Sequence, residues 1–406
     1  MTDRFPSACP YRHTDFAAEG LDLDPGYALL RRDEPLARVT MPYGGDAWLV
    51  TRHEDVKTVL ADPRFSRAAA AGRDIPRTLP LPDQQNASLV SLDPPEHSRL
   101  RRLVAKAFTA RRVKELRPNV QGVVDGLVDR MVRSGAPADL VAGLAWPLPL
   151  TVISDVLGIP VDDHDRFRRW TEQSVALSAA DPQVIKAADD ALRAYLRAMI
   201  AERRAEPADD LLGALVAARD EGDRLSEEEL VTFGVNVLIA GQETTAAEIG
   251  NFVYTLLSRR ERWEQLAADP ELVATAVEEL LRLTPLEASV GGLGFTRLAT
   301  EDVEIGGRTV RAGEAVVAQN ASANRDERVF DRPDELDFAR ESVPHLTFGH
   351  GPHHCLGAPL ARLELQVVLD TLVRRLPGLR LAVPSDEVEW TPNRAVRSVR
   401  KLPIAW

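Results

Sequence analysis

The chain has 406 residues, 44% of them hydrophobic and 28% charged, which is the composition of a globular protein with enough material for a core. Its formal net charge of -12 makes nucleic acid and anionic membranes unfavourable partners, so we expect neither. Two cysteines, Cys9 and Cys355, are too few for a disulfide framework and fit a reducing compartment. No early stretch has the pattern of a signal peptide, and the longest apolar stretch, residues 230–257, is too polar to span a bilayer. We therefore expect a cytoplasmic protein.

Strand patterns are few and clustered. Residues 38–41 and 47–51 are apolar and β-branched enough to predict two short strands near the N-terminus. A third strand region is predicted at residues 303–317, where Gly306 and Gly307 have the pattern of a tight hairpin turn. The sequence therefore predicts a small β portion.

Helical periodicity covers most of the remaining chain. Ser226 and Glu229 have the spacing of a capping box, and they begin a helix that we expect to run to about Ser258. The middle of this helix is apolar on nearly all sides, so it should be buried. Further helices are predicted at residues 118–133, 189–204 and 358–376. With no repeat, low-complexity tract or linker, the sequence predicts one mainly α domain over residues 1–406, and a monomer.

The strongest chemical signal is the segment FGHGPHHCLG at residues 348–357. Its three glycines and one proline describe a tight loop in which the backbone closely approaches another group. Cys355 comes just before a predicted helix, whose free N–H groups and dipole favour a thiolate, and a thiolate is a soft metal ligand. A chance cysteine in a plain surface turn is the alternative without chemistry.

Two metal centres compete for this loop. Zinc would need His350, His353, His354 and Cys355, but four ligands within six residues, two of them adjacent, do not easily form a tetrahedron. Haem iron needs only Cys355 from one side, with the glycines allowing the porphyrin to approach the backbone. The loop therefore favours haem over zinc.

A second signal lies in the middle of the long helix, at residues 240–245 (AGQETT). Gly241 weakens a helix, and burying the carboxylate of Glu243 is unfavourable unless it is paired or takes part in chemistry. Together with the hydroxyl of Thr244, these residues indicate a local opening where an acid and an alcohol face a ligand. A core polar network, or a helix kink without catalytic meaning, is the alternative. Gln242 lies beside the pair, and its role is open.

Other charged residues are weaker signals. Glu279 and Arg282 form an i, i+3 pair, which is most often a solvated salt bridge on a helix surface. Four cations, each more often an ordinary surface charge than a ligand, are also notable: His97, Arg101, Arg297 and His353.

The loop at residues 348–357 resembles the haem-binding loop of the cytochrome P450 family, Phe-Gly-x-Gly-x-His-x-Cys-x-Gly, and every fixed position is present. The resemblance implies the P450 fold, in which haem b lies between the long central helix and the helix after the cysteine. It also implies that Cys355 binds the iron, and that Glu243 and Thr244 deliver protons to bound dioxygen. The residues that it assigns to the haem pocket are His97, Arg101, Arg297, Phe348, His353, Cys355 and Gly357.

The same resemblance implies a haem-dependent monooxygenase that hydroxylates or epoxidises a small molecule with O2. Electrons would come from a ferredoxin and its reductase, because the chain has no flavin or iron–sulfur motif. It further implies that Glu279 and Arg282 lock structurally to Arg340. The segments that it assigns to the substrate pocket are rich in Ala, Leu, Val and Gly, and they predict a bulky, largely apolar substrate of secondary metabolism: residues 66–90, 166–185, 237–245, 286–293 and 391–396.

A basic cluster between His97 and Pro118 is exceptional in an acidic chain, because Glu115 is the only acid within it. A solvated helix face is one explanation. A docking site for an acidic ferredoxin is the other, and we favour it because the resemblance places this segment on the cysteine side of the haem. The basic residues are Arg99, Arg101, Arg102, Lys106, Arg111, Arg112, Lys114 and Arg117.

Three other functions stay open at the level of sequence. The first is oxidative coupling or rearrangement of a peptide- or polyketide-derived metabolite. The second is a peroxide-driven enzyme, although there the pair of Glu243 and Thr244 would be expected to be replaced. The third is a non-catalytic haem or zinc protein, against which a substrate-sized cavity would count. A nucleotide-binding loop at residues 291–294 is rejected, because no helix follows it and the glycine spacing is wrong.

Overall fold

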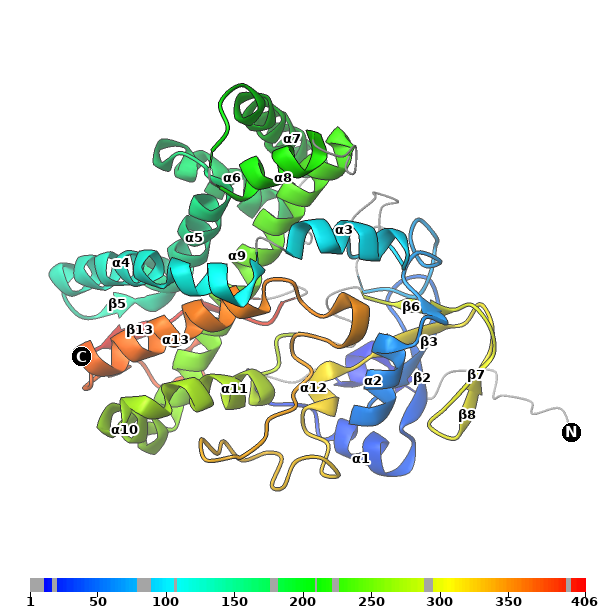
Figure 1. Ribbon diagram of the computed structural model, residues 1–406. Helices are drawn as coiled ribbons and strands as arrows, with labels where there is room; N and C mark the ends of the chain where they lie inside the picture. The colour runs from blue at the N-terminus through cyan, green and yellow to red at the C-terminus, as the bar shows by residue number, and fades with distance from the viewer. Residues whose placement is uncertain are drawn as a thin grey trace, which may run out of the picture.

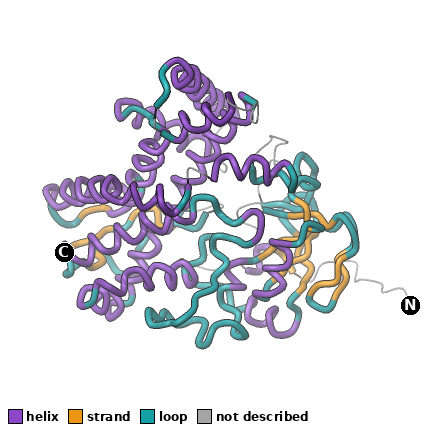
Figure 2. The backbone as a smooth tube through the Cα atoms, viewed as in Figure 1, coloured by secondary structure: helices purple, strands orange, loops and turns teal. Residues whose placement is uncertain are grey.

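The computed structural model places most helices on one side of the molecule and the main β-sheet, with α1, α2 and α12 beside it, on the other (Figure 1, Figure 2). The structure describes residues 11–16, 20–78, 89–105, 108–175, 182–208, 210–220, 226–287, 295–391 and 396–406. Helices α6, α7 and α8 form a layer at one end of the helical side, above α9 in Figure 1. The prediction of a mainly α protein with a small β portion is confirmed.

The helices have the following bounds: α1 Gly26–Asp33, α2 His53–Ala61, α3 Glu96–Ala105, α4 Ala110–Ser134, α5 Pro147–Leu157, α6 His164–Val175, α7 Pro182–Ala205, α8 Leu211–Asp220, α9 Glu227–Ser258, α10 Arg260–Ala268, α11 Val273–Leu283, α12 Asn320–Ala323 and α13 Ala358–Arg375. The prediction of a helix at residues 358–376 is confirmed. The prediction that a helix begins at Pro118 is wrong. The side chain of Thr109 caps α4 by accepting from the Arg112 amide, so the helix begins earlier and Pro118 lies inside it.

The main sheet has six strands in the order β1-β2-β3-β9-β6-β4. Its strands are β1 Tyr11–Arg12, β2 Leu36–Thr40, β3 Asp46–Val50, β4 Phe65–Ser66, β6 Arg297–Ala299 and β9 Ala315–Ala318. Strands β2 and β3 lie one or two residues before their predicted positions, because their antiparallel register pairs Leu36 with Val50 and Thr40 with Asp46. Strand β9 pairs with β3 and β6, so the N-terminal hairpin and the segment after α11 share one sheet.

The predicted hairpin is also present. Strands β7 (Val303–Ile305) and β8 (Arg308–Val310) pair antiparallel around Gly306 and Gly307, whose φ angles of 58° and 77° suit a tight hairpin turn. The remaining strands form two small sheets: β5 Ala138–Asp139 with β13 Pro403–Ala405 and β10 Arg380–Leu381, and β11 Glu389–Trp390 with β12 Val399–Lys401.

Helix α9 is the centre of the helical side. The predicted capping box is present: the Glu229 amide donates to Ser226 Oγ at 3.1 Å, and the Ser226 amide donates to the Glu229 carboxylate at 2.6 Å. The helix ends at Ser258, as predicted, and it packs against α5, α7, α10 and α13. Its buried residues belong to the largest hydrophobic cluster of the described chain. Within the described residues, no helix combines the length and the apolarity needed to cross a membrane.

The coil between α12 and the Cys355 loop has little regular structure and is held by side chains. Glu279 and Arg282 are both fully buried, and Arg282 contacts both carboxylate oxygens of Glu279, at 2.8 and 2.7 Å. Arg340 joins from the coil at 3.1 Å, so the predicted lock is confirmed and a solvated surface pair is excluded. Arg282 also donates to three backbone carbonyls of the coil, those of Asn324, Pro333 and Glu335.

Candidate active site

The loop before α13 is a tight structure closed by its own backbone. Gly349 and Gly351 have φ angles of 72° and 70°, which favour glycine, and the Cys355 amide donates to the Phe348 carbonyl at 2.8 Å. A Cβ atom on Gly351 would lie only 2.8 Å from Cα of Ala61, at the end of α2. The glycine pattern read from the sequence is therefore explained by this turn and by its close contact with α2.

Cys355 is exposed, yet it is surrounded by enough protein for burial to raise the pKa of its thiol. The two observations agree if the sulfur faces an internal space and not bulk solvent. The backbone N–H groups of Gly357 and Ala358 and the guanidinium of Arg101 act in the opposite direction and favour the thiolate. A metal that binds this sulfur would deprotonate it.

Helix α9 has a second group of partly exposed residues within a packed part of the molecule. Val237, Ala240, Gly241 and Thr244 follow one another at the spacing of a single helix face, and all four are at least partly exposed although α9 is packed on several sides. Thr244 donates its hydroxyl hydrogen to the Ala240 carbonyl at 2.7 Å. Such a bond to the carbonyl four residues earlier tends to bend a helix. Glu243, beside Thr244, is half-buried.

Other polar side chains of α9 and α13 are buried without hydrogen-bond partners among the described residues. They are both amide atoms of Gln242, both carboxylate oxygens of Glu248, and one oxygen of Glu364 on α13. Burial raises the pKa of Glu248 and raises that of Glu364 to about 8. These side chains therefore make no direct hydrogen bonds to one another within the described residues.

The four cations singled out in the sequence lie near one another. The rings of His97 and His353 are 4.3 Å apart, and His97 is buried with neither ring nitrogen bonded within the described chain. Burial, followed by Arg297 and His97, lowers the pKa of His353 to about 3. Arg101 donates to the carbonyl of His354, beside Cys355, at 2.5 Å.

Sequence reasoning missed a fifth member of this cluster, Arg67. It is buried, donates to the carbonyls of Val90 at 3.0 Å and Thr296 at 2.5 Å, and lies close enough to Arg297 to lower its pKa. Burial is the larger cause, and the pKa of Arg297 falls to about 10. No motif marks Arg67, because its importance comes from partners far away in the sequence.

These residues fit a haem group. Arg297 is buried, its Nε atom has no partner in the described structure, and Asp93 offsets only part of the positive charge around it. Such a cluster is suited to an anionic ligand group, as the two propionates of haem b are, and Cys355 supplies the iron ligand. The zinc alternative is not supported, because no three His, Cys, Asp or Glu side chains of the described residues gather as a metal site.

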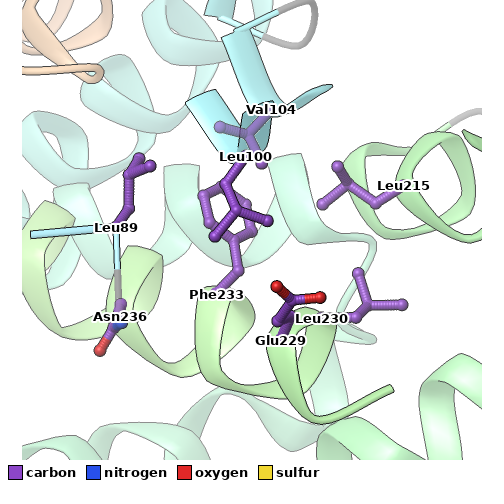
Figure 3. A pocket seen from close by; sticks show the side chains of 8 residues that line it. All are labelled: Leu89, Leu100, Val104, Leu215, Glu229, Leu230, Phe233 and Asn236. Atoms are coloured by element: carbon purple, nitrogen blue, oxygen red, sulfur yellow. The ribbon is translucent and has the colours of Figure 1, made fainter. Parts of the chain in front are cut away.

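A small, mostly apolar cavity of about 10 Å³ lies further along α9, toward its N-terminus, where α3 and α8 approach it (Figure 3). Phe233 and Asn236 line it and lead directly into the partly exposed face that begins at Val237. The ion pair of Arg99 on α3 with Glu229 lies beside it, at 2.5 Å. The lining residues are Leu89, Leu100, Val104, Leu215, Glu229, Leu230, Phe233 and Asn236.

Several predicted pocket segments cannot be placed. Residues 79–88, 176–181, 288–294 and 392–395 lie outside the described residues, as do Cys9 and Lys106. Among the described parts, residues 237–245 belong to α9, Ser66 pairs with β6, and residues 286–287 pair with residues 396–397.

Comparisons with known proteins agree with this arrangement. The family model for cytochrome P450 matches residues 176–395. The chain is 57% identical over 387 residues to nocardicin C N-oxygenase of Nocardia uniformis subsp. tsuyamanensis, covering 95% of this chain and 96% of that protein. It is 48% identical over 406 residues to mycinamicin IV hydroxylase/epoxidase of Micromonospora griseorubida, covering 100% of both. Among solved structures, the LnmA cytochrome P450 hydroxylase from the leinamycin biosynthetic pathway of Streptomyces atroolivaceus S-140 is 51% identical, with a TM-score of 0.91 over 96% of this chain and 98% of that one.

A helical fold with a cysteine loop facing an internal space and a cluster of buried cations defines a haem-thiolate protein. The chain belongs to the cytochrome P450 family, as its monooxygenase relatives and their fold show. The family's cofactor is haem b, held by a cysteine thiolate.

Proposed function

We propose that the chain is a single-domain P450 monooxygenase of the cytoplasm that hydroxylates or epoxidises a bulky, largely apolar small molecule of secondary metabolism. The observation that carries this proposal is the combination of an inward-facing Cys355 with a buried cation cluster. When bound, haem b supplies the activation of O2 that such reactions need. The relatives support the assignment, since their names describe oxygenation of natural products.

In this proposal the haem pocket is made by residues of three segments. Cys355 is the iron ligand, and the Phe348 and Gly357 positions shape the loop around it. His97 and Arg101 of α3, Arg297 of β6 and His353 of the loop bind the propionates. The orphaned nitrogens of His97 and Arg297 support these roles, because each needs an acceptor that the described chain does not provide.

Glu243 and Thr244 are proposed to move protons. The Thr244 hydroxyl is fixed by its bond to Ala240, and its oxygen lone pairs remain free to accept a proton donor on the partly exposed side of α9. Glu243, the neighbouring acid, is only half-buried and can therefore exchange protons with water. This acid and alcohol pair favours O2-dependent chemistry over a peroxide-driven enzyme.

The class of substrate rests on the partly exposed face of α9, where Val237 and Ala240 are apolar. The cavity toward the start of α9 is too small to hold a substrate, and Glu229 and Asn236 line it together with apolar residues such as Leu100. A second candidate reaction is N-oxygenation, which is favoured by the 57% identity to nocardicin C N-oxygenase. Oxidative coupling is a third, supported by 45% identity to a cytochrome P450 whose structure is described as having biaryl coupling reactivity.

A ferredoxin is the proposed electron donor, docking on α3 and the start of α4. Arg101 and Arg102 are adjacent on α3: the first reaches the loop of Cys355, and the second is exposed. Arg117 of α4 contacts Gln366 of α13, the helix that follows the cysteine, at 3.3 Å. The exposed cations therefore lie on the cysteine side of the molecule, where an acidic partner would bring its electron closest.

The decisive test is the absorption spectrum of the dithionite-reduced, haem-loaded protein with carbon monoxide. A Soret band at the long-wavelength position typical of thiolate ligation, lost in Cys355→Ala, supports the assignment. An imidazole-type spectrum, or failure to take up haem in a folded protein, refutes it. Turnover with a ferredoxin, its reductase and O2 then distinguishes the candidates: hydroxylation, epoxidation and simple N-oxygenation add one oxygen, whereas coupling joins two rings without adding one. Fragmentation of the product locates the new oxygen on carbon or nitrogen.

A further inference from the structure

Glu287, in the segment that follows α11, carries a buried carboxyl group that nothing in the described chain pairs with. Its Oε2 atom is buried and has no hydrogen-bond partner among the described residues, whereas the residue as a whole remains partly exposed. Burial raises the pKa of this carboxyl to about 8, and no cation among the described residues lowers it. Because an unpartnered buried carboxyl is unfavourable in free energy, such a group is usually explained by a partner that binds there.

Backbone contacts connect the segment of Glu287 to α9. Glu287 pairs with Val396, and the Arg397 amide donates to the Leu286 carbonyl at 2.8 Å. The Arg397 carbonyl in turn accepts from the side chain of Asn251 on α9, also at 2.8 Å. Asn251 lies two helical turns beyond Thr244, on the same side of α9 but in a fully buried stretch of the helix. One pair of backbone segments therefore joins Glu287 to the side of α9 on which Thr244 lies.

The other side of this segment is joined to the loop of Cys355. The Leu281 carbonyl, near the end of α11, accepts from the Thr347 hydroxyl at 2.6 Å, and Thr347 directly precedes Phe348. The segment that carries Glu287 consequently runs between α9 and the cysteine loop, the two elements that face the proposed active space.

Neighbouring polar groups do not neutralise the carboxyl. The Arg397 guanidinium donates to the carbonyls of Gly20 and Asp22, at 3.0 and 2.9 Å. Tyr27 of α1 is near enough for Glu287 to raise its pKa; its hydroxyl accepts from Gln319 at 2.9 Å, and a neutral phenol does not cancel the charge of a carboxylate. The surroundings of Glu287 thus offer acceptors and a satisfied arginine, which is the environment that a positively charged donor would complete.

We propose that Glu287 binds a basic nitrogen of the substrate, so that the substrate is a largely apolar molecule carrying a protonated amine or amidine. This inference rests on the proposed oxygenase function and narrows its substrate class. A cation that leaves water for an apolar pocket needs a counter-charge, and a single desolvated carboxylate then both strengthens binding and fixes the orientation of the molecule. Neutral hydrogen-bond donors, or an ordered water at Glu287, are the alternatives that the experiment separates.

The test compares two ligands of similar size on haem-loaded protein by isothermal titration calorimetry, near pH 8.5, where the carboxylate form is populated. One ligand is 4-phenylbutyltrimethylammonium, whose nitrogen has no lone pair and cannot bind iron. The other is the neutral 6-phenyl-1-hexanol. The variants are Glu287→Gln, which keeps the shape of the side chain, and Glu364→Gln, which also removes a buried, unpartnered carboxyl but lies on α13.

We expect Glu287→Gln to weaken binding of the cation by about tenfold, the effect of losing one partly desolvated charge pair, and to change binding of the alcohol by less than about twofold. Glu364→Gln should change neither. An equal loss for both ligands, no loss for either, or no binding of the cation to the parent protein overturns the inference. The proposed function is tested separately by the carbon monoxide spectrum, so a normal spectrum with no charge preference removes this inference alone.

Discussion

The buried carboxyl of Glu364 makes the stability of this protein depend on pH in a way that one substitution removes. In the folded protein burial raises its pKa from 4.5 to about 8, so the folded chain keeps a proton that the unfolded chain loses above about pH 4.5. The stabilising contribution is complete below that pH and is lost as the pH rises toward 8. At about 1.4 kcal/mol per pH unit the total loss is about 5 kcal/mol, of which about 2 kcal/mol falls between pH 6 and pH 8.

Glu364→Gln cannot ionise, so its unfolding free energy should fall by about 2 kcal/mol less between pH 6 and pH 8 than that of the parent protein. Urea unfolding of the haem-loaded protein, followed by far-UV circular dichroism at both pH values, measures this difference. The other titrating groups contribute equally to the pH dependence of both proteins, so their contributions cancel in the difference between them. Glu261→Gln, at an exposed position of α10, is the matched control and should leave the pH dependence unchanged. Identical pH dependence of the Glu364→Gln and parent proteins would refute the reasoning.

Three further predictions concern the site and its supports. Thr244→Ala should retain the carbon monoxide spectrum but form roughly tenfold less product per O2 consumed, since the hydroxyl that positions a proton is lost; an unchanged product yield contradicts the proposed role. Glu279→Gln should lower the unfolding free energy by about 3 to 5 kcal/mol, because it leaves buried guanidinium groups without their carboxylate, and unaltered urea unfolding would contradict this. Arg102→Glu with Lys114→Glu, both at exposed positions, should slow ferredoxin-driven reduction about tenfold at low salt and less at high salt, measured by stopped-flow absorbance. Lys401→Glu, on β12, is the control; equal slowing by it would indicate an effect of net charge and not of docking.

Patterns of neighbouring residues predicted the local features, whereas the lock to Arg340 and the grouping of His97 with Arg297 were predicted only through the resemblance to the P450 family. The capping box at Ser226 and the glycines around Cys355 are local, and both have the structure that their patterns indicate. The start of α4 was misplaced because Pro118 has the pattern of a first helical turn, whereas the cap at Thr109 is followed by few apolar residues.

Two residues whose surroundings come from distant segments, and which no family motif marks, were not predicted. Arg67 depends on carbonyls at Val90 and Thr296, and nothing near it in the sequence marks a charged pocket. Glu287 is a single acid two residues after Pro285, and the sequence does not show that its carboxyl lacks a partner. That becomes evident only in the fold, where its segment pairs with residues 396–397. For such residues the pattern carries no signal, because burial and charge balance are properties of the assembled fold.

The coil held by Arg282 has a consequence for how the cysteine loop is supported. A strand or helix can form part of its own hydrogen bonds, but the carbonyls of Asn324, Pro333 and Glu335 receive theirs from a side chain of α11. The coil makes several turns of its own, but these three carbonyls find their donors only where α11 packs beside it. The cysteine loop follows this coil, so the placement of the proposed iron ligand depends on a helix that lies far from it in the sequence.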